Sequence, residues 1–240
     1  MPITELDSGA LREWERITSH IGEEHGRPKR ERHWPFRLLG RAAWALGVAV
    51  LPFVALVRVA VFLYAREGYP TALALAAGAA CTAAIVTGYA AWAWHRLTGR
   101  LELGLLARRV AIPLVLAYCG YMLLYLSSTH AKSPDVRHYY STLHPLLRVA
   151  LSTLILVDRN LVVTDLARRP EDYRTMRLPA NDGSLHYVQK DGYSHAADLR
   201  TEGRNVITSL LVQVYFWAMG FGTLRHVGTA DHLHVELPVH

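Results

Sequence analysis

The sequence predicts a membrane protein in two parts, three transmembrane helices followed by a small α+β domain. Apolar residues are concentrated in the stretch 42–128, whereas both ends of the 240-residue chain are polar. Charged residues make up 19% of the chain, below the roughly 25% that is usual for soluble domains. Nine of the 13 histidines lie after residue 129. We therefore expect a cytoplasmic polar segment at 1–40, a membrane region at 41–128 and a histidine-rich domain at 129–240.

The polar N-terminal segment contains one candidate helix. Leu11, Trp14 and Ile17 recur at helical spacing, and Asp7 or Ser8 is placed to cap the helix that carries them. We expect this helix to pack in the cytosol against a neighbouring surface, with a position on the membrane surface as the alternative. The segment lacks an early apolar core, so we expect no signal peptide.

Three apolar runs are long enough to cross a bilayer, whose hydrocarbon core of about 30 Å needs roughly 20 helical residues. They comprise Ala42–Tyr64, Thr71–Trp94 and Val110–Ser128. Arg58 lies within the first run, close enough to its end for the guanidinium to reach the headgroups. The second run has no charged residue and is rich in Ala and Gly, which favour close contact between helices in lipid. The lipid bilayer is therefore the first expected partner.

Basic residues in the connecting segments predict the orientation of these helices. They cluster before the first run and between the second and third runs, and include Lys29, Arg30, Arg32, Arg37, Arg41, Arg96, Arg100, Arg108 and Arg109. The link between the first and second runs holds only Arg66 and Glu67. The positive-inside rule then places the N-terminus in the cytoplasm, and three spans place the C-terminal domain outside.

The charge of the C-terminal segment excludes one class of partner. Residues 129–240 contain 12 Lys and Arg against 11 Asp and Glu, so their net charge is +1. A nucleic-acid-binding domain would carry a basic stripe, so we expect no nucleic-acid partner. The two cysteines, Cys81 and Cys119, both lie in apolar runs, so the polar regions have no disulfide framework.

Helical and strand-like patterns alternate along the C-terminal domain. The expected helices are a stripe from Leu143 to Leu154, a second helix beginning near Pro170, and an apolar helix, Val206–Met219, stopped by Gly220. The expected strands are Leu161–Thr164, Ala196–Leu199 and Leu233–Leu237. Because Val206–Met219 is short for a membrane span, we expect it to be a buried core helix.

The polar clusters of this domain contain candidate metal ligands. In a strand, alternate residues face the same side, so His232 and His234 point together. On its own this pair is typical of a surface strand. A second cluster adds His186 and His195 as nitrogen donors and Asp198 as a carboxylate. One histidine and the aspartate of this cluster, with a distant histidine, give three protein ligands and leave a fourth zinc position for water, as in catalytic sites.

In this order, the clusters resemble the D-alanyl-D-alanine zinc metallopeptidase superfamily. It includes D,D-carboxypeptidases and peptidoglycan endopeptidases, and the hedgehog signalling domain shares its fold. The matching segments are Thr164 to Arg168 as the arginine segment, Ser184-Leu185-His186 as the Ser-x-His motif, Ala197-Asp198-Leu199 as the end of the Asp motif, and His232-Leu233-His234 as the HxH motif. The resemblance covers roughly residues 140–237 and implies an α+β domain of the D,D-peptidase and hedgehog type, with Zn²⁺ as its cofactor.

The resemblance also implies the ligand set, although the spacing departs from the family. His186, Asp198 and His234 are the implied zinc ligands. His186 and Asp198 are twelve positions apart, more than in the family. Either the segment 189–195 is an insertion, which we prefer, or His195 replaces His186 as the ligand.

The implied catalytic residues leave one assignment open. Asp231, three positions before His234, replaces the glutamate that some members of the family have there, so the general base is either His232 or Asp231. Arg168 is implied to stabilise the oxyanion. Its alternative is a surface salt bridge to a neighbouring acidic residue, Glu171 or Asp172.

The function implied is that of a membrane-anchored zinc metallopeptidase. It would hydrolyse stem or cross-link peptides of peptidoglycan, as a D,D-carboxypeptidase or endopeptidase at the cytoplasmic membrane of a bacterium. The predicted orientation agrees, because that substrate lies outside this membrane. The alternative is a non-catalytic zinc- or ligand-binding membrane protein of the same fold, which the altered spacing favours. A channel or transporter role is disfavoured, because Arg58 has no acidic partner within the spans.

Overall fold

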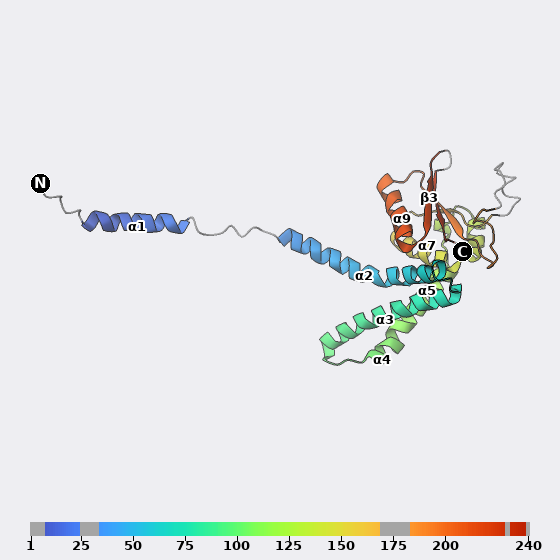
Figure 1. Ribbon diagram of the computed structural model, residues 1–240, viewed down its shortest axis with the longest axis horizontal. Helices are drawn as coiled ribbons and strands as arrows, with labels where there is room; N and C mark the ends of the chain where they lie inside the picture. Colours follow the sequence, from blue (N-terminus) through green and yellow to red (C-terminus); the bar gives the residue numbers. More distant parts are fainter. Residues whose placement is uncertain (1–7, 25–33, 169–182, 229–230, 239–240) are drawn as a thin grey trace. The chain divides into compact units, whose positions relative to one another are not determined.

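The computed structural model describes residues 8–24, 34–168, 183–228 and 231–238, and the chain forms two compact units, Met1–Leu46 and Gly47–His240. The first unit contains α1 (Ser8–Glu24) and the beginning of α2 (Trp34–Ala65) (Figure 1). The expected N-terminal helix is thus present, and its apolar side chains at Leu11, Trp14 and Ile17 are exposed. The helix expected to begin near Pro170 lies outside the described residues.

Three helices of the described chain are long and apolar enough to cross a membrane. They are Leu38–Ala65 within α2, α3 (Thr71–Thr98), and Leu103–Leu124. The last consists of α4 (Leu103–Leu106), a π-helical turn η1 (Ala107–Ala111) and α5 (Ile112–Leu124). The three predicted runs are therefore helices. The third begins earlier than the apolar run, because arginine is a good helix former and the helix continues through Arg108 and Arg109.

The first two membrane helices pack closely around a proline. Pro52 lies inside α2 and has no N–H, so the carbonyl of Val48 loses its helical partner. Tyr89 of α3 donates its hydroxyl to that carbonyl at 2.7 Å. Nearby, a Cβ on Gly78 of α3 would lie 2.4 Å from the carbonyl oxygen of Leu56, so only glycine permits this approach. In lipid each backbone group needs a partner within the protein, and Tyr89 supplies it here.

The C-terminal segment folds around a four-stranded antiparallel sheet. Its elements are η2 (Ser128–His130), α6 (Pro134–His138), η3 (Tyr139–Thr142), α7 (Pro145–Val157), β1 (Val163–Asp165), β2 (Ala196–Arg200), α9 (Val206–Met219), β3 (Gly222–His226) and β4 (His232–Glu236). The strand order is β1-β2-β4-β3. The helix and strands predicted around α7, β1, β2 and β4 are present, with bounds shifted by at most three residues.

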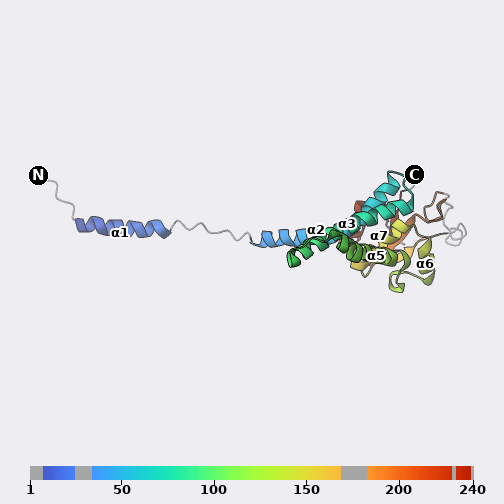
Figure 2. The same ribbon diagram turned by 90° about the horizontal axis from the view of Figure 1, so that it is seen from below.

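The sheet domain is packed directly on the membrane helices. One cluster of buried side chains includes Val61 of α2, Met122 of α5, Leu147 of α7 and Leu233 of β4. Figure 2 shows α5 and α7 within the same compact region. Because the core is continuous, the domain is held in place by the membrane helices and is not suspended from them on a linker.

Polar contacts complete this attachment at the end of α5. The carbonyl groups in the last turn of a helix have no helical partner. Tyr140 donates its hydroxyl to the carbonyl of Met122 at 2.6 Å, and Arg148 of α7 donates to that of Leu123 at 2.8 Å. Burial raises the pKa of Tyr140 to about 12, so this donor keeps its proton at physiological pH.

The apolar helix α9 differs from the prediction of a buried core helix. Only one of its faces is buried, through Ser209, Val212, Phe216 and Met219. Apolar residues occupy almost the whole circumference of α9. The domain contacts only one side of the helix, so the apolar residues on the opposite face are exposed.

Candidate metal centre

Strand pairing brings together two of the predicted ligands. β2 and β4 are antiparallel neighbours, and Asp198 lies directly opposite His234 in their register. The Nδ1 atom of His234 lies 2.8 Å from Oδ1 of Asp198. The Asp198 side chain is only 4% exposed, whereas that of His234 is 17% exposed. The carboxylate is therefore at the floor of the site and the imidazole at its open side.

The third predicted ligand, His186, reaches this pair from a turn. The Oγ atom of Ser184 accepts a long hydrogen bond from the N–H of His186, and the N–H of His195 donates to the carbonyl of Leu185 at 2.8 Å. The backbone of Gln189 bonds that of Tyr193 at 2.8 Å, which closes the intervening residues into a loop. This loop accommodates the twelve-residue separation of His186 from Asp198.

The three donor atoms fit a zinc ion. Nε2 of His186 lies 3.3 Å from Nδ1 of His234 and 3.3 Å from Oδ1 of Asp198. Tetrahedral zinc with bonds of about 2.0–2.1 Å holds its ligand atoms about 3.3 Å apart. The 2.8 Å pair is shorter because His234 and Asp198 share a hydrogen bond. Loss of that proton and an opening of about 0.5 Å would bring this pair to the same spacing.

The charges around Asp198 keep it ionised. Burial disfavours the carboxylate, but hydrogen bonds from His186 and His234 outweigh burial and hold the pKa of Asp198 well below its usual value. Its Oδ2 atom accepts a hydrogen bond from Nη2 of Arg168 at 2.8 Å. For His234, burial favours the neutral ring, but the hydrogen bond to Asp198 and the charges of Asp198 and Glu236 raise its pKa overall. An anionic ligand is therefore available at neutral pH.

Arg168 lies at this site. Its Nε atom also bonds Asp165 of β1, and its backbone N–H donates to the carbonyl of His186 at 3.0 Å. The arginine thus contacts the segments that carry two of the three ligands. The alternative partners Glu171 and Asp172 lie outside the described residues.

His232 and Asp231 occupy different surroundings. Nε2 of His232 lies 3.8 Å from Oδ2 of Asp198, and its side chain is 25% exposed. Asp231 instead accepts hydrogen bonds from Thr201 at 2.5 Å and from Nη2 of Arg225 at 3.0 Å. Side chains alternate along an extended strand, so Asp231 is directed away from the face that carries His232. Of the two candidate bases, only His232 is beside the ligands.

Two residues near the site were not predicted from the sequence. Oε2 of Glu236 lies 3.4 Å from Nε2 of His234, the usual position of a carboxylate that orients a metal-bound histidine. His226 of β3 stacks on His232, with ring centroids 4.7 Å apart. Glu236 follows His234 by two positions, so strand alternation alone places it on the same face. Identifying His226 requires the register of the β3–β4 pair, in which it lies opposite His232.

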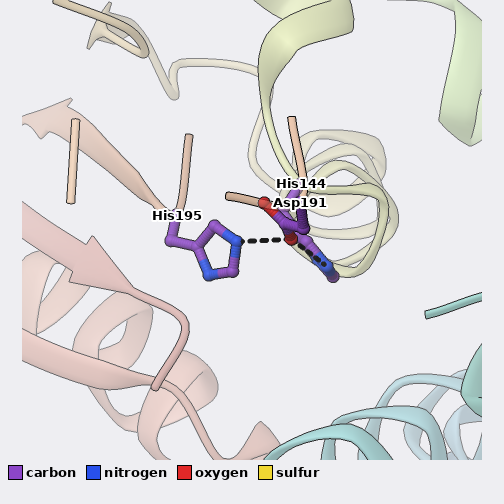
Figure 3. A group of neighbouring side chains, drawn as sticks. All are labelled: His144, Asp191 and His195. Atoms are coloured by element: carbon purple, nitrogen blue, oxygen red, sulfur yellow. Dashed lines mark hydrogen bonds and ion pairs between the residues drawn. The ribbon is translucent and has the colours of Figure 1, made fainter. Parts of the chain in front are cut away.

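His195, the alternative ligand, belongs to a separate group. Its Nε2 atom lies 2.8 Å from Oδ2 of Asp191, which is 3.7 Å from Nε2 of His144 (Figure 3). His195 stands three positions before Asp198, so strand alternation directs the two side chains to opposite faces. Within the described residues, two groups bring three such donor atoms within 4.8 Å of one another, this one and the group of His186, Asp198 and His234.

The hydrogen bonds of the His195 group fit a polar network better than a metal site. The N–H of Leu146 donates to Nδ1 of His144 at 3.3 Å, which places the proton of a neutral ring on Nε2. That Nε2 lies 2.9 Å from the hydroxyl of Thr71, at the beginning of α3. Burial lowers the pKa of His144 to about 3, so its ring is neutral at physiological pH. The network joins α7, the loop 189–195 and a membrane helix.

Comparison of the chain with protein-family models, curated proteins and solved structures finds no match. The functional argument therefore rests on the residues and their geometry. Among the described residues, those of the candidate metal centre carry it.

Proposed function

We propose that this chain is a membrane-embedded zinc peptidase that hydrolyses stem or cross-link peptides of peptidoglycan. The observation that carries the proposal is the convergence of Nε2 of His186, Oδ1 of Asp198 and Nδ1 of His234 at 2.8–3.3 Å. Three protein ligands leave one position of a tetrahedral zinc ion for water, the arrangement of catalytic sites. When bound, the ion would lower the pKa of that water to about 7 and polarise the scissile carbonyl.

His232 is the general base of this proposal. Its Nε2 atom lies beside the ligands, and its partial exposure lets it face both solvent and substrate. It takes the proton of the attacking water and returns it to the leaving amine, a role that histidine performs well near neutral pH. Stacking on His226 restricts the ring of His232. Asp231 is not assigned this role, because Thr201 and Arg225 engage its carboxylate.

Arg168 has a positioning role and an electrostatic role. Its Nη2 atom holds the Oδ2 atom of Asp198, so that Oδ1 remains directed at His186 and His234. Its positive charge beside the ligands would also stabilise the negative charge that develops on a carbonyl oxygen during amide hydrolysis. The non-catalytic alternative rests on the long His186–Asp198 separation, which the closed loop at 189–193 accommodates without separating the ligands.

The substrate class rests on topology and on the motif resemblance. The positive-inside rule, applied to the basic segments, predicts a cytoplasmic N-terminus and an outer domain, on the side where peptidoglycan lies. The domain packs on the membrane helices, so the site stays close to the membrane in which peptidoglycan precursors are assembled.

The test uses the full chain in detergent or nanodiscs, because the domain shares its core with the membrane helices. Zinc per chain is measured after loosely bound metal is removed, for the parent and for His186→Ala, His234→Ala and His195→Ala. We expect one zinc in the parent, lost in the first two variants and retained in the third. A folded parent that binds no zinc would overturn the proposal, and a second zinc lost in His195→Ala would contradict our assignment of that group.

Activity is then measured on peptides ending in D-Ala-D-Ala and on cross-linked muropeptides. His232→Ala should retain zinc and lose about 10²–10⁴-fold in kcat, the usual contribution of a general base. Asp231→Asn serves as the matched control, and we expect it to retain activity. Stoichiometric zinc with no hydrolysis of any of these substrates would instead establish the non-catalytic alternative.

A further inference from the structure

The helix α9 exposes a continuous apolar face. Its 14 residues contain no charged side chain. Six large apolar residues on one side of the helix are 47–71% exposed: Val206, Ile207, Leu210, Leu211, Val214 and Trp217. Soluble proteins rarely leave such a patch in water. The face therefore requires an apolar partner.

The C-terminal end of α9 lies against a membrane helix. A Cβ on Gly220, which ends α9, would be 2.3 Å from Nη1 of Arg58 and 3.0 Å from Cγ1 of Val61, both in α2. Arg58 precedes the end of α2 at Ala65 by seven residues, or about 10 Å of helix. In Figure 1, α9 runs across the direction of α2. The C-terminal end of α9 thus contacts the side of α2 before α2 reaches its own end.

Arg58 indicates the depth of this contact. An arginine within a transmembrane helix directs its guanidinium to the headgroup level, and tryptophan is enriched at the same level. Arg58 is exposed and lies next to Gly220, which follows the exposed Trp217 by three positions. The last carbonyls of a helix carry partial negative charge, which favours a cation at this position. Arg58 and Trp217 together place α9 at the boundary between headgroups and acyl chains.

We propose that α9 is an in-plane membrane helix whose exposed face inserts among the acyl chains of the leaflet on the domain's side. Its apolar residues extend the apolar surface of α2 sideways along the membrane. This also gives Arg58 a function, because its guanidinium binds at the headgroup level and at the end of α9. The proposal requires α2 to cross the membrane and is independent of zinc binding and of catalysis.

The test measures the depth of spin labels on the full chain in phospholipid nanodiscs. Single cysteines are introduced at Leu210 and Val214 on the exposed face, and at the exposed Glu202 just before α9 as a control, after replacement of Cys81 and Cys119 by alanine. Collision of each label with oxygen, which partitions into lipid, is compared with collision with a water-soluble nickel chelate. A melting curve of each labelled protein confirms that it remains folded.

We expect the labels at Leu210 and Val214 to collide with oxygen several-fold more, relative to the nickel chelate, than the label at Glu202. Equal access of the nickel chelate to all three positions would overturn the proposal. Exclusion of both reagents, together with spin–spin broadening between labels, would also overturn it. That result would show that a second copy of the chain covers the face.

Discussion

Replacing Glu236 with glutamine tests whether the site is built to hold a metal. In the structure, Oε2 of Glu236 lies 3.4 Å from Nε2 of His234, the ring nitrogen opposite the donor atom Nδ1. A carboxylate in this position fixes the ring and makes its donor nitrogen more basic, and its loss usually costs 10–100-fold in metal affinity. Glutamine keeps the size of the side chain but removes the charge.

The geometry places the expected loss at the lower end of that range. The 3.4 Å distance exceeds the 2.7–2.9 Å of a strong charge-assisted hydrogen bond, and the side chain of Glu236 is 43% exposed, so water screens its charge. We therefore expect about tenfold weaker zinc binding, equivalent to about 1.4 kcal/mol. The dissociation constant is measured by competition with a chromophoric chelator at fixed pH.

Two further variants make this measurement decisive. A Cβ on Gly222 would lie 2.7 Å from Cγ of Glu236, so Gly222→Ala should displace the carboxylate and weaken zinc binding in the same direction. Glu202→Gln, at an exposed position outside the site, should bind zinc as the parent does. Parent-like affinity in Glu236→Gln would refute the role assigned to this carboxylate.

Other predictions concern the membrane helices, the pH dependence and the second histidine group. Tyr89→Phe removes the donor to the carbonyl of Val48, and we expect it to destabilise the protein by about 1 kcal/mol, seen as a lower melting temperature in detergent. Because folding raises the pKa of His234, the metal-free protein should gain stability as the pH falls through this raised pKa toward about 6.5, the ordinary pKa of histidine. Because folding lowers the pKa of Asp198, the protein should lose stability again below about pH 4. Zinc must displace the proton of His234, so its affinity should fall over the pH range in which the metal-free protein gains stability. His195→Ala should lower the melting temperature without loss of zinc, because it removes a buried hydrogen bond of the network.

Each of these predictions has its own check. Tyr69→Phe, at an exposed tyrosine, should leave the melting temperature unchanged, and an equal effect of both tyrosine substitutions would contradict the assigned role of Tyr89. The gain of metal-free stability as pH falls toward about 6.5 should disappear in His234→Ala. If it persists there, another group titrates. A melting temperature of His195→Ala equal to that of the parent would show that the network does not stabilise the fold.

Hydropathy and charge patterns predicted the membrane helices because lipid imposes one simple requirement, a long run of apolar residues. The same patterns did not reveal which helix faces lie against protein. Val206–Met219 is apolar almost all round, so its pattern fits a buried helix and a membrane-surface helix equally well, and only packing distinguishes them.

The candidate site shows the same division between local and long-range information. Strand alternation alone separates His195 from Asp198 and Asp231 from His234, because each pair is three positions apart. By contrast, the meeting of His186 with the two strands depends on a loop closed by backbone hydrogen bonds between Gln189 and Tyr193. Such pairing has no signature in residue type, so spacing was an unreliable guide there.

The continuous core between the membrane helices and the sheet has a consequence for the position of the candidate metal centre. A domain on a flexible linker searches a volume set by the length of the linker. Here the packing of Val61, Met122 and Leu147 into one cluster fixes the candidate metal centre relative to the membrane helices, in both distance and orientation. Under the proposed function, a site held in this way would reach only peptides in one thin layer above the bilayer, and its rate would follow the density of peptides in that layer. Lengthening the membrane helices by one turn should then change which peptides it reaches, with no change at the site itself.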